Sequence, residues 1–178
     1  HILENRLNEL AKEAMGDTPI NLASPDDKSM LLYSRRVKDK ALWSMTFNLG
    51  HEMRGNTIKP KMKTRMKNTE FVRCVRRMTD IVYKTIGRQC QTCNGSGRVT
   101  PLKKDGSKGK AKRICKVCIG KGVNYTSTGE VAGFKLIPRT VRDTASAGFK
   151  TDKVTLEDRL SELDGNAREF CEAYVRYN

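Results

Sequence analysis

The chain contains Cys90-Gln91-Thr92-Cys93-Asn94-Gly95-Ser96-Gly97 and, further along, Cys115-Lys116-Val117-Cys118-Ile119-Gly120-Lys121-Gly122, two copies of the pattern C-x-x-C-x-G-x-G. Two residues between the cysteines let both thiolates of one knuckle reach the same metal ion, and the glycines supply tight turns that aim backbone N–H groups at sulfur. Two knuckles together offer four thiolates, the closed tetrahedral set of a structural zinc site, which leaves no position for a reactive water. The sequence therefore predicts one structural zinc per chain, bound by Cys90, Cys93, Cys115 and Cys118.

A disulfide framework is the alternative interpretation of these cysteines. It is less favoured, because no secretion signal opens the chain and disulfides are rare in reducing compartments. A redox-active C-x-x-C is less favoured still, since one shared ion accounts for the duplication. Cys74 and Cys171 lie on apolar helical stripes and are expected to be buried free thiols. His51 is expected to be a surface residue, because the cysteines already complete the coordination.

Charge is concentrated in the middle of the 178-residue chain, whose formal net charge is +15. Residues 50–125 hold 20 Lys and Arg against 4 acidic residues, whereas the flanks hold 15 basic and 16 acidic residues. Such an excess favours a polyanionic partner, with nucleic acid first. No apolar run approaches the roughly 20 residues that a membrane span needs, so no membrane partner is expected. The shift in composition predicts boundaries at 1–49, 50–132 and 133–178.

The flanks are typical of helices. Leucines at spacings of three and four predict a helix over 2–15, and Ser24-Pro25 can open a second, since Ser caps free N–H groups and Pro suits the first helical position. Further helices are expected over 42–47, from Asn68 to Ile86, over 152–163 and over 166–177. We expect little β structure, concentrated near the cysteines. Core positions are predicted for Trp43, Phe71 and Tyr83, and core or exposed-chain positions for Met45, Met53, Met62, Met66 and Met78.

Two resemblances attach to the knuckles alone and cover about 40 residues. The duplicated pattern resembles the cysteine-rich region of J-protein co-chaperones and the late antiterminators of lambdoid phages. J-proteins would bring further copies of the pattern and a His-Pro-Asp tripeptide, and this chain has neither.

The flanks resemble a different family. Leu3 to Tyr33, above all Pro19-Ile20-Asn21-Leu22-Ala23-Ser24-Pro25-Asp26-Asp27-Lys28-Ser29-Met30-Leu31-Leu32-Tyr33, is similar to the thumb of family A (Pol I-like) DNA polymerases, with Asp27 and Lys28 where the family usually has Gln-Leu. Phe149-Lys150-Thr151-Asp152-Lys153-Val154-Thr155-Leu156-Glu157-Asp158-Arg159-Leu160 looks like the second thumb element of that family, and 167–176 is similar to its helix that returns toward the palm.

This resemblance implies a mainly α fold, a helical thumb hairpin into which a basic zinc-knuckle module with a little β structure is inserted. It implies a phage-type DNA-directed DNA polymerase (a nucleotidyltransferase) that acts in DNA replication, of which this segment carries no catalytic residue, because the family's catalytic aspartates lie in the palm, downstream of Asn178. The expected partners are duplex primer–template DNA, the rest of the polymerase chain and a processivity factor. The expected location is the cytoplasm, that of the host cell if the protein is phage-encoded.

The thumb of this family grips duplex DNA through backbone contacts, which position the protein without reading sequence. Family-like positions in the flanks make Ser24, Lys150, Thr151 and Lys153 candidate contacts. In the basic centre the candidates are Arg73, Arg76, Arg77, Lys103, Lys104, Lys108, Lys110, Lys112 and Arg113. Because aromatic residues make up only 6% of the chain, binding of single strands by base stacking is not favoured.

Two other functions remain open. A free-standing zinc regulator, such as a phage antiterminator, would account for the knuckles and the charge but not for 19–33 or 149–160. A docking module for a processivity partner would be supported by exposed apolar residues around Val117, Ile119 and Val123.

Overall fold

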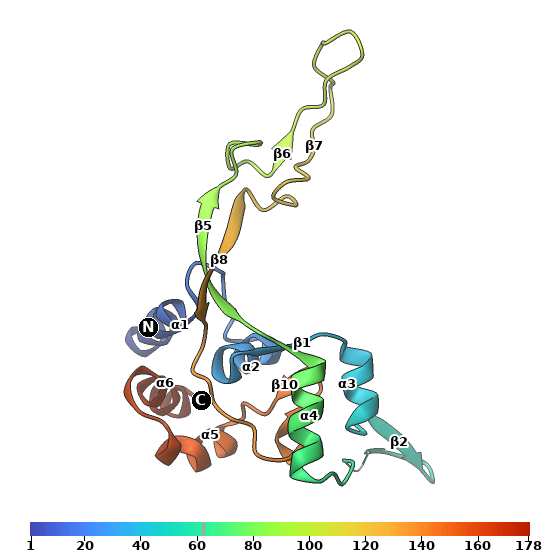
Figure 1. Cartoon of the computed structure of the whole chain (residues 1–178), viewed down its shortest axis with the longest axis vertical. Coiled ribbons are helices and arrows are strands. Elements are labelled where there is room, and N and C mark those ends of the chain that lie inside the picture. The colour runs from blue at the N-terminus through green and yellow to red at the C-terminus, as the bar shows by residue number, and fades with distance from the viewer. Residues whose placement is uncertain (62) are drawn as a thin grey trace. The chain divides into compact units, whose positions relative to one another are not determined.

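A computed structural model describes residues 1–61 and 63–178 (Figure 1). Met62, one of the methionines interpreted above, lies outside the described residues. The chain forms two compact units, residues 1–84 with 129–178 (unit 1) and residues 85–128 (unit 2). Unit 2 lies inside the range 50–132 that the charge pattern marks out, and the functional boundaries expected from the sequence stay predictions.

The predicted helices are present in both flanks. Ser24 caps the second helix as expected, since its Oγ accepts a hydrogen bond from the Asp27 N–H and Pro25 occupies the first helical position. The first helix ends at Gly16, whose φ of 79° is the left-handed geometry that favours glycine. The helices are α1 (Ile2–Met15), α2 (Pro25–Tyr33), α3 (Lys40–Thr46), α4 (Asn68–Met78), α5 (Lys153–Arg159) and α6 (Gly165–Tyr177), with 3-10 turns η1 (Val141–Asp143) and η2 (Leu160–Glu162).

The expectation of a mainly α fold is wrong. The fold is mixed, with 38% helix and 23% strand among several small sheets. Unit 1 contains three two-stranded antiparallel ribbons, β1–β4, β2–β3 and β9–β10, so strand is not confined to the cysteine region. The strands are β1 (Arg35–Val37), β2 (His51–Arg54), β3 (Thr57–Pro60), β4 (Thr79–Ile81), β5 (Tyr83–Gln89), β6 (Arg98–Val99), β7 (Arg113–Ile114), β8 (Val123–Val131), β9 (Thr144–Ala145) and β10 (Gly148–Phe149).

The helix predicted from Asn68 to Ile86 shows why the expectation of a mainly α fold was wrong. It ends at Met78 and not near Ile86, because Thr79–Ile81 pairs with Arg35–Val37 in β1 and the chain continues as β5. Residues 79–86 are rich in β-branched and aromatic side chains, which pack well on a strand. Their pairing partners are distant in sequence, so the apolar spacing alone did not show the pairing.

The core of unit 1 is an aromatic cluster. Trp43 and Phe71 are fully buried as predicted, and Trp43 packs edge-on against Phe47 (4.6 Å between ring centroids) and Phe149 (5.4 Å). The Trp43 indole N–H donates to the Ala145 carbonyl at 2.8 Å, which satisfies its one polar group. Tyr83, by contrast, is 41% exposed, so its predicted core position is wrong, because it lies in β5 and not on a helix.

The two ends of the chain share an interface. Helices α1 and α6 lie side by side in unit 1 (Figure 1), with Leu10 and Phe170 buried in the same core. At the rim the Arg6 guanidinium pairs with both carboxylate oxygens of Glu169, at 2.7 and 3.1 Å. The ends therefore pack together as a pair of helices.

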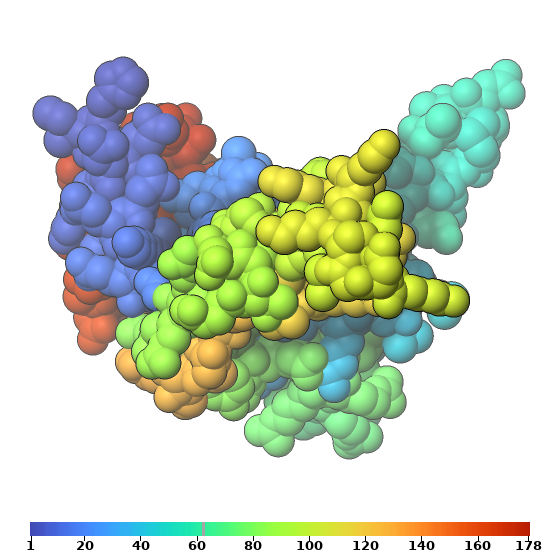
Figure 2. All heavy atoms as spheres, turned by 90° about the horizontal axis from the view of Figure 1, so that it is seen from above, coloured from blue at the N-terminus to red at the C-terminus, as the bar shows by residue number. Residues whose placement is uncertain are grey.

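The hairpin of β2 and β3 projects from unit 1, and Figure 2 shows it at the edge of the view. Its cross-strand pair Met53 and Ile58 is 63% and 68% exposed. Among the residues described, none of the helices combines the length and the hydrophobicity required to cross a bilayer.

Candidate metal centre and basic surfaces

The four predicted cysteines come together in unit 2. Their sulfur atoms all lie within 4.8 Å of one another, with Sγ–Sγ distances of 3.9 Å for Cys90–Cys115 and 3.6 Å for Cys93–Cys118. A tetrahedral zinc with Zn–S bonds of about 2.3 Å would hold its sulfurs roughly 3.8 Å apart. All four side chains are buried, and none is in a disulfide. The cluster has the spacing and the chemistry to bind a metal ion.

The two knuckles adopt the same backbone conformation. Asn94, Gly95 and Gly97 have φ of 51°, 79° and 76°, and the matching positions of the second knuckle have φ of 55°, 78° and 73°. In each knuckle the last glycine donates its N–H to sulfur, Gly97 to Cys93 at 3.3 Å and Gly122 to Cys118 at 3.2 Å. Such N–H donors stabilise a thiolate, which is the form that binds metal.

Backbone hydrogen bonds join the knuckles into one module. The Cys90 N–H donates to the Gly122 carbonyl and the Cys115 N–H to the Gly97 carbonyl, each at 2.9 Å. The ribbon β6–β7 continues this pairing through Arg98 and Ile114. The sulfur cluster is therefore the small core of unit 2, with Val99 as the partly buried apolar residue packed on it.

The pKa values of Cys90 and Cys118 are shifted in opposite directions. The Cys93 backbone N–H, together with other donors, lowers the pKa of Cys90 to about 6, which favours its thiolate form. Burial raises the pKa of Cys118. Binding of a cation at this point would overcome that cost, because a metal favours the charged form of every thiol around it.

The candidate DNA contacts of unit 2 lie in the loop between β6 and β7. Lys103, Lys104, Lys108, Lys110, Lys112 and Arg113 are all exposed. The loop is organised by its own backbone, since Lys103 N–H donates to the Ser107 carbonyl at 2.7 Å and Gly109 N–H to the Pro101 carbonyl at 2.7 Å. Asp105 accepts from both the N–H and the hydroxyl of Ser107 and closes the tip.

The candidate contacts Arg73, Arg76 and Arg77 lie on the exposed face of α4 in unit 1. The structure adds a neighbour to this face that the sequence analysis missed. Strand β1 pairs with β4, which follows α4 directly. An open cleft there is lined by Arg35, Arg36, Lys38 and Arg76, and by Asp80, which pairs with Lys38 at 3.4 Å. The short run Arg35-Arg36-Val37-Lys38 was a visible basic signal, but its place beside α4 depends on strand pairing.

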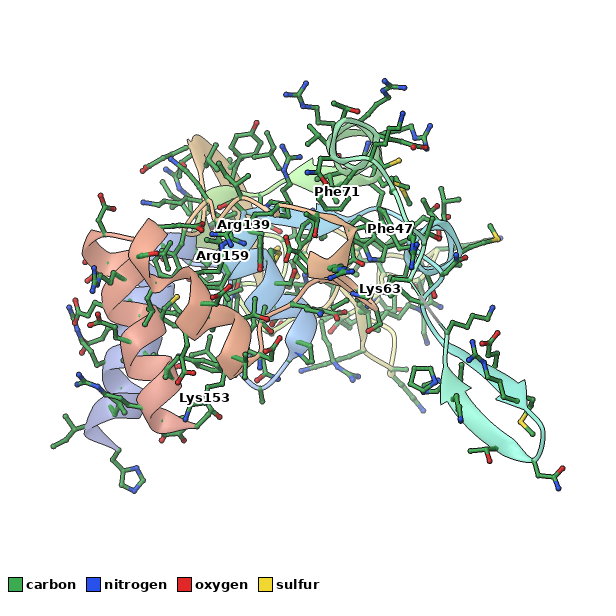
Figure 3. The ribbon with its side chains drawn as sticks, turned by 90° about the horizontal axis from the view of Figure 1, so that it is seen from below. Phe47, Lys63, Phe71, Arg139, Lys153 and Arg159 are labelled. Atoms are coloured by element: carbon green, nitrogen blue, oxygen red, sulfur yellow. The ribbon has the colours of Figure 1, made fainter. Side chains whose placement is uncertain are left out.

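Of the family-like candidates in the flanks, two are held by the fold itself. The Ser24 hydroxyl caps α2, and Thr151 is buried (8% exposed). Lys150 is half-buried, and Lys153 is exposed at the start of α5 (Figure 3). Lys153 and Lys150 are therefore the flank candidates best able to meet a ligand.

The two family-like segments contact each other. The Tyr33 hydroxyl, whose pKa is raised by burial, donates to the Lys150 carbonyl at 2.7 Å, and the Phe149 N–H donates to Ser29 Oγ at 2.8 Å. The rings of Tyr33 and Phe149 lie 4.8 Å apart. Segments 19–33 and 149–160 thus form one packed element of unit 1.

Comparison of the chain with models of protein families, with curated proteins and with solved structures gives no match.

Proposed function

We propose that this chain is the thumb-type, DNA-gripping part of a family A DNA polymerase, and that its four cysteines bind one structural zinc. The observation that carries the proposal is the contact between 19–33 and 149–160. These segments resemble the two elements of the family's thumb and lie far apart in sequence, and they pack together through Tyr33, Phe149 and Lys150.

The choice of zinc follows from the ligand set. Four thiolates in a closed tetrahedron suit zinc or an iron–sulfur centre among the common metals, and the C-x-x-C pairs with glycine-donated N–H···S bonds are typical of zinc knuckles. The ion would hold the two knuckles together, since unit 2 has little apolar core of its own. Its role is structural, because all four coordination positions are filled by protein.

The DNA partner follows from the cations. Duplex DNA presents regularly spaced phosphates, and Lys and Arg contacts to them bind the backbone without sequence preference. Two surfaces offer such contacts, the arginine face of α4 with β1 in unit 1 and the loop 103–113 in unit 2. The thumb would grip the duplex while the chemistry of nucleotide transfer belongs to the palm.

Fluorescence anisotropy of a labelled 20-base-pair duplex, measured over a range of salt concentrations, tests this function. If about five phosphates are neutralised, log affinity should fall with log salt at a slope of about −4 to −5. A slope near zero would overturn the proposal. A single strand of the same length should bind more weakly, because few exposed rings are present for stacking. Recovery of RNA polymerase in a pull-down, with no stimulation of a DNA polymerase, would favour the zinc regulator instead.

One observation favours a docking module as the second candidate. Two of the three apolar residues predicted for such a surface, Val117 and Ile119, are 60% and 76% exposed, whereas Val123 is half-buried. Ile114 in β7, next to the second knuckle, is also 60% exposed, and grouped exposed apolar side chains are typical of a docking surface. A processivity partner that covers these side chains would explain why they are exposed in the isolated chain. Full processivity of the parent enzyme without any partner would count against this role.

A further inference from the structure

Unit 1 contains an open cleft of about 600 Å³ between residues 63–68 and the turn at 140–142. Three cations line it, Lys63, Arg65 and Arg142, together with the hydroxyl-bearing residues Thr64 and Thr140. None of these five was among the candidate DNA contacts of the sequence analysis, because Arg142 is distant in sequence from the other two cations.

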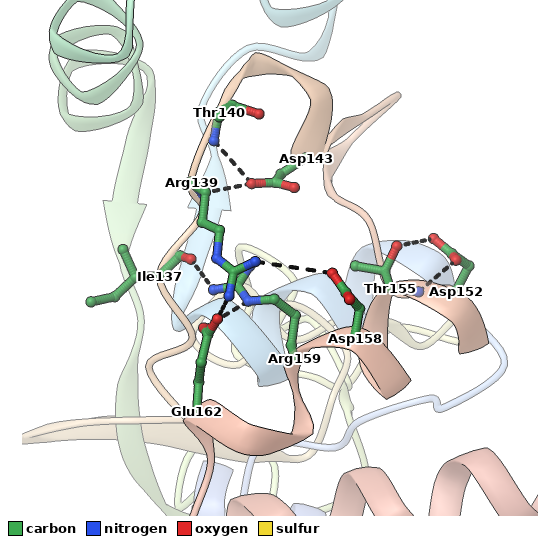
Figure 4. A network of polar contacts seen from close by, with 9 residues as sticks. All are labelled: Ile137, Arg139, Thr140, Asp143, Asp152, Thr155, Asp158, Arg159 and Glu162. Atoms are coloured by element: carbon green, nitrogen blue, oxygen red, sulfur yellow. Dashed lines mark hydrogen bonds and ion pairs between the residues drawn. The ribbon is translucent and has the colours of Figure 1, made fainter.

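One wall of the cleft is a rigid turn. Asp143 Oδ2 accepts hydrogen bonds from the Arg139 N–H at 2.6 Å and the Thr140 N–H at 3.0 Å (Figure 4). Thr140 Oγ1 accepts a hydrogen bond from the Arg142 N–H at 3.3 Å. The buried Thr144 hydroxyl donates to the Val141 carbonyl at 2.7 Å and closes the turn. The backbone that carries Arg142 is thus held in place before any ligand arrives.

Lys63 joins the opposite wall to this turn. Its ammonium donates to the carbonyls of Arg142, at 3.1 Å, and of Thr144, and Figure 3 labels it beside that segment. Two hydrogen bonds leave one of its three N–H donors for a ligand. Partial burial and the nearby charge of Lys150 lower the pKa of Lys63 to about 8, so an anion bound beside it would stabilise the ammonium form.

The positive charge of the cleft is offset only in part by Asp143, which favours the charged form of Lys63. Among the ion pairs of the described chain, none involves Lys63, Arg65 or Arg142. One carboxylate oxygen of Asp143 accepts hydrogen bonds from two backbone N–H groups. Arg139 differs from the cleft cations, since its guanidinium pairs with Asp158 and Glu162 (Figure 4). Helix α4 also begins at this cleft without a side-chain cap, which adds N–H donors.

We propose that this cleft binds a phosphate group of the DNA backbone. Arg142 and Arg65 would contact non-bridging oxygens as charge-assisted donors, with Lys63 and the threonine hydroxyls completing the site. The inference rests on the proposed function and extends it. It adds a phosphate contact near Lys150, whose N–H donates to the Asp143 carbonyl at 2.7 Å and whose charge acts on Lys63.

The test compares Arg65→Gln/Arg142→Gln with Lys12→Gln/Arg176→Gln, a matched loss of two exposed cations on α1 and α6. All four side chains are exposed, so circular dichroism should show unchanged thermal unfolding for both variants. For the 20-base-pair duplex, the Arg65→Gln/Arg142→Gln variant should bind roughly tenfold more weakly at low salt, with a log–log slope about 1 unit shallower than the unmutated chain. The Lys12→Gln/Arg176→Gln variant should match the unmutated chain.

The outcomes separate the two proposals. If the slope of log affinity against log salt is equally steep in the unmutated chain and the Arg65→Gln/Arg142→Gln variant, the cleft does not bind a DNA phosphate, and the proposed function is unaffected. A slope near zero for the unmutated chain would overturn both. Inorganic phosphate, followed by ³¹P line broadening, distinguishes the source of the ligand: broadening that the Arg65→Gln/Arg142→Gln variant abolishes, with no change in duplex binding, would assign the cleft to free phosphate and contradict the DNA contact.

Discussion

Ile119 occupies a backbone conformation that its side chain disfavours. Its φ is 55°, where the first knuckle has Asn94 at 51°. Asn tolerates this left-handed region, whereas a β-branched residue there is strained by roughly 1–2 kcal/mol. Because Ile119 is 76% exposed, little burial would be lost on replacing it.

We therefore predict that Ile119→Asn stabilises zinc-loaded unit 2 and that Asn94→Ile destabilises it. Chemical denaturation followed by release of zinc to a chromogenic chelator measures both effects. A lower midpoint for Ile119→Asn would contradict the strain argument and would show that the isoleucine packs more favourably than its exposure indicates.

Gly97 and Gly122 are required for a second reason, close approach of the two knuckles. A Cβ on Gly97 would lie 2.3 Å from the Gly120 carbonyl oxygen, and one on Gly122 would lie 2.3 Å from the Gly95 oxygen. Gly106 has a similar φ of 83° but open space around it, so it is a matched control.

Gly97→Ala should weaken zinc retention and lower the unfolding midpoint well beyond Gly106→Ala, for which we expect a loss of about 1 kcal/mol from backbone strain alone. The same denaturation assay measures both. Equal effects would mean that the knuckles separate to accept the methyl group, and that their backbone contact contributes little.

At the scale of elements, local signals predicted the helices well. The leucine spacing of α1 and the Ser-Pro cap of α2 act within a few residues, and both are confirmed. The ribbon β1–β4 was missed because its strands pair across more than forty residues. The hairpins β2–β3 and β9–β10 are local, but their strands are too short to show an alternating pattern. The helix predicted from Asn68 to Ile86 was too long because of the β1–β4 pairing, since the residues after Met78 pair with β1 although their apolar spacing fits a helix.

The α1–α6 pair should be held by apolar burial and not by its ion pair. Leu10 is fully buried, whereas Arg6 and Glu169 are 41% and 45% exposed at their side chains. We expect Leu10→Ala to destabilise unit 1 by about 3 kcal/mol. Arg6→Ala should change stability little, because an exposed pair is screened by water. Urea unfolding checks this; a larger loss for Arg6→Ala would contradict it.

At the scale of the whole molecule, the cysteine cluster was predictable and the basic surfaces only partly. The spacing of the cysteines predicted all four residues of the cluster, because each knuckle is formed by residues that are close in sequence. The exposed arginines of α4 also followed from helical spacing. The sequence did not predict which cations share a cleft, because long-range packing decides this. The cations missed for this reason are Arg35, Arg36, Arg142 and Lys63.

The two units should respond differently to loss of the metal. Cys93→Ser, which removes one of four ligands, should unfold residues 88–123 and leave the aromatic core of unit 1 intact. Amide hydrogen exchange with peptide resolution measures this, with Cys74→Ser as a control for loss of a buried thiol outside the cluster. Loss of protection at Trp43 and Phe71 in the Cys93→Ser variant would show that the units do not fold independently.

The central claim is that a metal-held module presents cations to duplex DNA. It is tested most directly by the affinity of the chain for a 20-base-pair duplex before and after zinc extraction, in one buffer, with metal content verified by elemental analysis. The loaded chain should contain about one zinc, and its affinity should fall roughly tenfold or more on extraction, because the cations of loop 103–113 are no longer held together. A metal-free preparation from anaerobic purification, or equal affinity with and without zinc, would contradict the account.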